Sequence, residues 1–129
     1  LTQVDGGYIR DVSVGNDGRI ILGGATEQND RHTSWISMIA ITLGGRLDST
    51  FSANGYLIGV ISGDGDNVKS VEVLKDGSVL ACGTRGVRES KISQAMILKY
   101  KPSGVLDSSF GKNGIALSIN KIRFFRIVI

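Results

Sequence analysis

Hydrophobic and polar residues alternate with a period of two in several short stretches, and such stretches predict strands. In YIRDVSV, residues 8–14, Ile9, Val12 and Val14 are spaced by polar residues, and the NDG that follows provides the turn of a hairpin. The chain then returns as RIILGGAT, residues 19–26. Further strands are predicted at residues 35–42, 56–61, 68–74, 78–84, 94–100 and 115–119. Helical periodicity is absent over any useful length, so the pattern predicts an all-β chain.

The predicted strands repeat. A shift of 59 positions aligns residues 1–59 with residues 60–118 without a gap, and it superimposes the Asp-Gly turns and many apolar positions. The phrase GRLDSTFSANG, residues 45–55, returns as GVLDSSFGKNG, residues 104–114. The sequence therefore predicts one domain built from two copies of a four-stranded unit, residues 1–59 and 60–118, followed by a tail, residues 119–129.

The repeated phrase predicts a structural turn. Its Asp can accept hydrogen bonds from backbone N–H groups two or three residues ahead, and its Leu and Phe, four residues apart, are expected to enter one core. The Asn-Gly pair then provides left-handed backbone positions before the last strand. A catalytic pair of the two Asp residues is the alternative, although equivalent residues of two repeats need not converge. The signature residues are Leu47, Asp48, Phe51, Asn54, Gly55, Leu106, Asp107, Phe110, Asn113 and Gly114.

These motifs resemble the bacterial delta-60 repeat, whose pattern is a strand, PDGKIVVAG, a variable loop, a strand and DGSLDTSFGxGG. This chain has GNDGRIILGGA with LGGRLDSTFSANG, and LKDGSVLACGT with PSGVLDSSFGKNG, so the resemblance covers residues 8–118. Asn16 and Lys75 stand where the family often has Pro, and Ser52 replaces the Gly that is kept at Gly111. The resemblance implies a β-propeller-like arrangement of four-stranded blades. It also implies a secreted or cell-surface bacterial protein of undefined activity.

Two blades do not close a propeller, because propellers need about four to eight. The ring is therefore expected to be completed either by further repeats of a longer array or by oligomerisation. A homotrimer with six blades is favoured, since rotational symmetry closes it. The tail NKIRFFRIVI breaks the repeat and is predicted to be an edge strand that closes a blade or docks on a neighbouring chain. A short interfacial membrane anchor is the alternative for this tail.

Composition and charge limit the classes of partner that the chain is expected to bind. Apolar residues make up 41% and charged residues 21% of the chain, as in a globular protein, and no apolar run is long enough to span a membrane. The net charge is +3, but residues 1–118 are balanced and the excess lies at Lys121, Arg123 and Arg126. No basic face for a phosphate backbone is expected, which argues against a nucleic-acid partner.

Few residues of the sequence are candidates for a reactive or metal-binding role. Cys82 lies in the apolar run SVLACG and is predicted to be a buried, reduced thiol. His32 is the only histidine and is expected in a solvated loop. SGDGDN places Asp64, Asp66 and Asn67 at the spacing of calcium-binding oxygens but lacks the Glu of an EF-hand. Turn formation is the other interpretation, so calcium is kept as a possible ligand and no other cofactor is expected.

The sequence favours a non-catalytic binding or scaffold module that contacts a protein or glycan through the loops that vary between repeats, at residues 27–34 and 86–93. Candidate contact residues are Tyr8, His32, Trp35 and Arg88. The alternatives are a hydrolase-type or calcium-dependent propeller enzyme, or a fragment of a longer surface protein. No set of residues supports catalysis, and a fold alone cannot.

Overall fold

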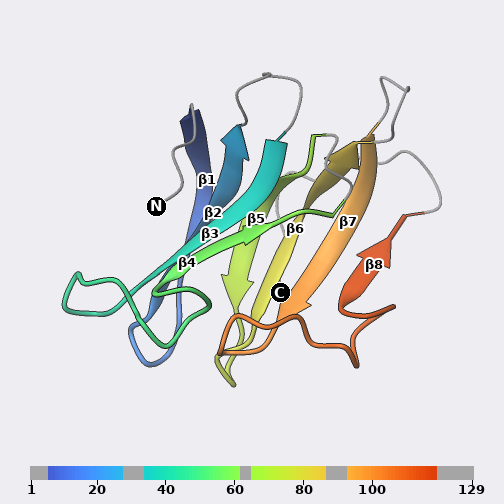
Figure 1. Ribbon diagram of the computed structural model, residues 1–129. Coiled ribbons are helices and arrows are strands. Elements are labelled where there is room, and N and C mark those ends of the chain that lie inside the picture. Colours follow the sequence, from blue (N-terminus) through green and yellow to red (C-terminus); the bar gives the residue numbers. More distant parts are fainter. Residues whose placement is uncertain (1–5, 28–33, 62–64, 87–92, 119–129) are drawn as a thin grey trace.

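The computed structural model describes residues 6–27, 34–61, 65–86 and 93–118, which form strands, turns and connecting segments. Sheet 1 consists of β1 (Gly6–Val14), β2 (Ile20–Glu27), β3 (Ser34–Ile41) and β4 (Tyr56–Gly59). Sheet 2 consists of β5 (Asn67–Val73), β6 (Val79–Gly86), β7 (Ser93–Tyr100) and β8 (Ile115–Leu117). Each sheet is antiparallel with its strands in chain order (Figure 1). The prediction of an all-β chain is confirmed.

The two sheets have the same internal construction. In both, the first strand carries a β-bulge near its middle, with the register shift between Ile9 and Asp11 in β1 and between Val68 and Ser70 in β5. A glycine of the second strand lies against each bulge: a Cβ at Gly24 would come within 1.8 Å of the Tyr8 carbonyl oxygen. The corresponding distance from Gly83 to the Asn67 oxygen is 2.0 Å. The 59-residue repeat thus reproduces even the irregularity of the sheet.

The strand registers divide each sheet into two faces, because residues paired across neighbouring strands point to the same side. We call the faces A and B, with equivalent residues on equivalent faces. Face B of sheet 1 carries Ile21, Ile36, Met38, Ala40 and Leu57. Face A of sheet 2 carries Val68, Val71, Val79, Ala81, Met96, Leu98 and Tyr100. All of these residues are buried and belong to one core cluster.

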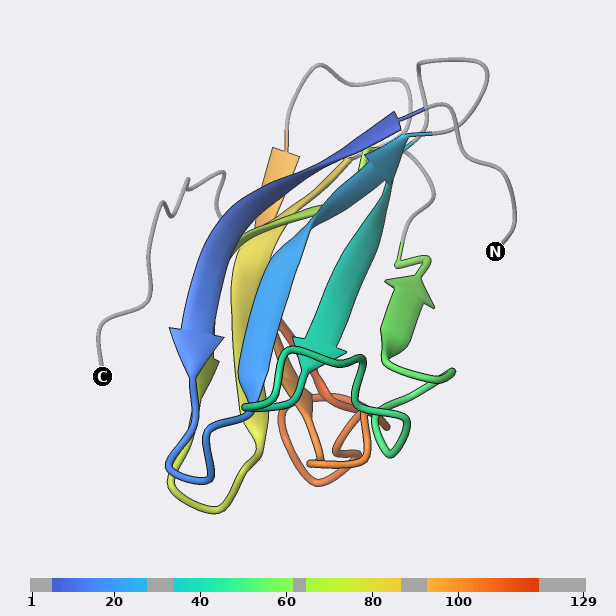
Figure 2. The same ribbon diagram turned by 90° about the vertical axis from the view of Figure 1, so that its left-hand side faces the viewer.

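The core therefore lies between face B of sheet 1 and face A of sheet 2. A Cβ added at Gly23, on face B, would lie 2.5 Å from Cγ1 of Val71 and 3.0 Å from Cγ1 of Val68. β5 of sheet 2 lies against β1 and β2 of sheet 1, and the two sheets diverge toward β4 and β8 (Figures 1 and 2). The absence of a side chain at Gly23 lets the valines of sheet 2 approach sheet 1.

The other two faces are turned away from this core. Face A of sheet 1 carries Ile9, Val12, Val14, Ile20, Leu22, Ile39 and Ile41, of which the first three are about half exposed or more. Face B of sheet 2 carries Leu80, Cys82, Ile97, Lys99 and Ala116, and of these only Cys82 is buried. Equivalent residues of the two repeats thus have different burial.

The repeated phrase shows the same difference, which corrects one expectation. Phe51 is fully buried but Leu47 is 43% exposed, so the two do not enter one core. In the second repeat the order is reversed, since Leu106 packs against the core and Phe110 is half-buried. The two side chains of the phrase point to opposite sides of their sheet. The Leu is covered by the preceding sheet, and the Phe is covered by the following sheet. Among the described residues, only one such neighbour exists for each repeat.

The described residues make two sheets packed face to face and no closed ring. They also contain no helix of the length and apolar character needed to cross a membrane. The tail, residues 119–129, lies outside the described residues, as do most of the variable segments, residues 28–33 and 87–92. The blade count and the role of the tail stay predictions.

Candidate functional site

The two Asp residues of the repeated phrase hold turns. Oδ1 of Asp48 accepts hydrogen bonds from the Thr50 N–H at 3.0 Å and from the Thr50 hydroxyl at 2.5 Å. Oδ1 of Asp107 accepts the same pair from Ser109, at 3.0 and 2.6 Å. Each turn closes further through the amide of the Phe, which donates to the Asp carbonyl. Asn54 and Asn113 follow with positive φ angles of 54° and 56°, as expected for the Asn-Gly turn.

Arg19 joins the first turn to the second repeat. Its Nε donates to Oδ2 of Asp48 at 2.7 Å, and its Nη2 donates to the Thr50 hydroxyl at 3.1 Å. Its Nη1 donates to the Pro102 carbonyl at 2.6 Å, and the Ser52 amide donates to the Ser103 carbonyl at 2.8 Å. Ser78 occupies the equivalent position in the second repeat, so this link occurs only between the two repeats.

These contacts keep both carboxylates ionised. The Thr50 hydroxyl, followed by its amide and by Arg19, lowers the pKa of Asp48. The Ser109 hydroxyl and amide lower the pKa of Asp107, with smaller contributions from Lys99 and Lys101. The two carboxylates belong to separate turns and have separate partners. A general acid needs a raised pKa near the working pH, and neither carboxylate has one.

Asp11 and Ser13 fasten the two sheets together, a role that sequence reasoning missed. Oδ2 of Asp11 accepts hydrogen bonds from the Ser70 hydroxyl at 2.9 Å and from the Val71 amide at 3.0 Å. The Ser13 hydroxyl accepts one from the Val73 amide at 3.0 Å. These amides belong to the edge strand β5, and the side chains of β1 satisfy them. The only sign of this role in the sequence is that Asp11 and Ser13 are alternate polar residues on the same face of β1.

The aromatic candidates for glycan contact do not form a common pocket. Tyr8 pairs with Ala25 and Trp35 pairs with Thr26, so the two aromatic side chains lie on opposite faces of sheet 1. The guanidinium of Arg10 lies 4.5 Å from the centre of the Tyr8 ring. Trp35 is partly buried at the start of β3. The other two candidates, His32 and Arg88, lie outside the described residues.

Of the two calcium candidates that the structure describes, Asp66 holds the backbone and Asn67 bonds to another side chain with its amide nitrogen only. Asp66 is buried, and its Oδ2 accepts a hydrogen bond from the Ile61 amide at 2.8 Å. Its backbone exchanges two hydrogen bonds with Ser34 of β3, which ties the start of sheet 2 to sheet 1. Asn67 donates from Nδ2 to the Thr84 hydroxyl at 3.1 Å, whereas its Oδ1 is buried without a hydrogen-bond partner among the described residues. Asp64 lies outside the described residues.

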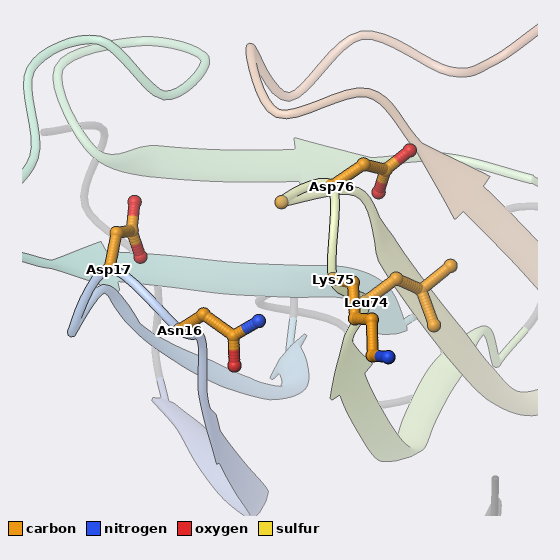
Figure 3. A pocket seen from close by; sticks show the side chains of 6 residues that line it. Asn16, Asp17, Leu74, Lys75 and Asp76 are labelled. Carbon is orange, nitrogen blue, oxygen red and sulfur yellow. The ribbon is translucent and has the colours of Figure 1, made fainter.

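A hollow lies between the hairpin turns of the two sheets. It measures about 260 Å³ and is lined by Asn16, Asp17, Leu74, Lys75, Asp76 and Gly77. Figure 3 shows that the labelled side chains diverge and do not converge on one point. Oδ1 of Asp17 accepts the Arg19 amide at 3.0 Å, and Oδ1 of Asp76 accepts the Ser78 amide at 2.9 Å. The hollow is thus a gap between two capped turns.

Cys82 is a buried free thiol on β6. Burial, helped by the negative charge of Asp11, raises its pKa to about 11. Very little thiolate is therefore present at neutral pH, and the thiol is a poor nucleophile. Within the described ranges, no three His, Cys, Asp or Glu side chains come together as metal ligands would.

Comparison of the chain with protein-family models, with curated proteins and with solved structures found no match. Inferences about function therefore depend on the repeat, the two sheets and the contacts between them.

Proposed function

We propose that the chain is a non-catalytic binding or scaffold module, built on propeller-type repeats of the delta-60 kind, that contacts a protein or glycan through its variable segments. One observation carries this proposal. The charged loops that vary between the repeats, residues 28–33 and 87–92, are both anchored at one end of the paired sheets (Figure 1). Their anchors are the pairs Glu27–Ser34 and Gly86–Ser93 at the ends of the hairpins.

The described carboxylates support the same proposal. Asp48, Asp107, Asp17 and Asp76 cap turns, and Asp11 joins the sheets. Groups that hold the backbone in this way are poorly placed to move protons during a reaction, because catalysis would break their structural bonds. Variation concentrated on one end of a rigid support is typical of binding surfaces.

A labelled chain applied to a glycan array tests the glycan half of the proposal. The matched control is a variant in which residues 28–33 are replaced by alternating Gly and Ser, with strand content checked by circular dichroism. Binding that the replacement abolishes supports a contact through this segment. A parallel panel of hydrolase substrates tests the enzyme alternative, and turnover that is lost on substitution of His32, Asp64 or Asp66 would overturn the proposal.

A further inference from the structure

The two repeats bury opposite faces, so each leaves the complement of an existing interface on the outside. Val71 is 1% exposed between the sheets, whereas its equivalent Val12 is 52% exposed on face A of sheet 1. Val68 is fully buried and its equivalent Ile9 is 48% exposed. The residue types hardly change between these positions, so the difference comes from the missing neighbour.

Face B of sheet 2 is the matching surface. Leu80, Ile97, Phe110 and Ala116 are only partly buried there, while their equivalents Ile21, Met38, Phe51 and Leu57 are buried between the sheets. Face A of sheet 1 and face B of sheet 2 point away from each other in one molecule (Figure 1), so they cannot meet within it. They can meet between two molecules.

The hydrogen bonds of the existing interface have counterparts on these outer faces. Inside the molecule, Asp11 and Ser13 accept from the amides of Val71 and Val73. The equivalent amides on β1 are those of Val12 and Val14, which the same strand geometry directs away from β2. Of the two equivalent residues on β5, Ser70 is buried and its hydroxyl already donates to Asp11, so the carboxylate of Glu72 is the acceptor on this face.

We infer that a second copy of this chain docks head to tail, with face A of its sheet 1 on face B of sheet 2, so that the interface between the repeats is continued between molecules. This assembly does not depend on the ligand-binding role proposed above. Its support is continuity with the interface between the sheets: the same strands, the same apolar positions and the carboxylate of Glu72 at the place of the Ser13 hydroxyl. A head-to-tail contact closes only as a ring, and three copies give six blades.

Two further differences between the repeats change the surface that face B of sheet 2 presents to the next copy. Cys82 stands where sheet 1 has Gly23, and Lys99 stands where it has Ala40. Nζ of Lys99 lies 3.7 Å from the Asp107 carboxylate, so its charge is directed toward the turn of the repeated phrase. A Cβ at Gly23 would lie 3.7 Å from Cβ of Val71. The same Cβ would lie only 2.5 Å from Cγ1 of Val71, so the next copy must sit slightly farther from Cys82 than sheet 2 sits from Gly23. Cβ of Cys82 then faces Val12 of the next copy, and Val12→Cys removes the methyl groups that crowd it.

The 3.7 Å between the equivalent Cβ positions inside the molecule falls in the range found in disulfides, whose Cβ atoms lie about 3.5–4.5 Å apart. The test is Val12→Cys, oxidised with oxidised glutathione and analysed by non-reducing electrophoresis and peptide mapping. We expect disulfide-linked multimers that join residue 12 of one copy to Cys82 of another. Val12→Cys combined with Cys82→Ser should remove this linkage. Val105→Cys, at an exposed turn position equivalent to Arg46, should not link to Cys82.

Light scattering tests the same assembly without a covalent cross-link. The wild-type chain should show a mass that rises with concentration toward three times 13.7 kDa, and Val12→Asp should keep it monomeric while its circular dichroism stays unchanged. The control is Val105→Asp, which should assemble like the wild type. A wild-type chain that stays monomeric up to about 1 mM, where even weak pairs associate, would overturn the inference. So would a Val12→Asp variant that assembles like the wild type.

Discussion

At the scale of single residues, identical residues of the repeat have different energetic roles. Phe51 and Phe110 occupy the same place in the same phrase, but only Phe51 is covered on both sides. The phrase alone cannot distinguish them, because the letters are the same. What differs is whether a following sheet is present, and that is decided by residues far away in the chain.

This difference predicts unequal costs of truncation. Phe51→Ala should reduce the free energy of unfolding by about 3–5 kcal/mol, because a large buried ring leaves a cavity. Phe110→Ala should cost clearly less, since its ring is already partly in water. Urea unfolding of dilute samples, followed by circular dichroism, compares the two variants. Equal losses would contradict the directional packing of the phrase.

The turn carboxylates predict a pH dependence. The pKa of Asp48 is lower in the folded chain than in the unfolded chain, so the unfolded state binds more protons near that pKa. The stabilisation is therefore present above the unfolded value of about 4 and is lost as the pH falls through the lower folded value. The Asp48→Asn variant keeps the shape without the charge.

Urea midpoints of the wild type and of Asp48→Asn, measured between neutral pH and about pH 2, check this expectation. The wild type should be more stable at neutral pH, and the difference should shrink below about pH 4. A difference that does not change with pH would mean that the charge of Asp48 has no part in holding the turn.

At the scale of strands and turns, local sequence patterns were sufficient to predict the elements. Alternation, the Asp-Gly hairpins and the Asn-Gly turns are encoded within a few residues, and the eight predicted strands match β1 to β8 to within a few residues. The contacts of Asp11 and Ser13 were not predictable in the same way. They depend on the register between two strands that are about 60 positions apart, and the second repeat has Ser70 and Glu72 there, so no motif marks them.

The β-bulges provide an element-scale prediction. Gly83→Ala should cost at least about 3 kcal/mol, the upper range for single substitutions, because the new Cβ would strike the backbone oxygen of Asn67. Gly44→Ala is the control, since its nearest atom would be the Thr42 hydroxyl at 3.9 Å. It should change stability by less than about 0.5 kcal/mol in the same urea titration. Similar effects of both substitutions would mean that the bulge relaxes freely.

At the scale of the whole molecule, the two sheets share one core, so they should unfold together. Val71→Ala, between the sheets, should lower the stability of both by about 2 kcal/mol. Val12→Ala, the same change at the equivalent outer position, should cost less than about 0.5 kcal/mol in a dilute sample. Thermal unfolding by calorimetry measures both variants. Two separate transitions, or equal effects of the two substitutions, would contradict a single shared core.

The opposite burial of the Leu and the Phe in the repeated phrase gives the molecule a direction. Sheet 1 receives the following sheet on its face B, sheet 2 receives the preceding sheet on its face A, and the two faces are not interchangeable. A tandem duplication of 59 residues therefore adds a complete sheet with both faces, wherever in the period the copied stretch begins. The gene can lengthen or shorten by whole periods without creating a new kind of interface, whereas gain or loss of a single strand would shift every later residue out of its place.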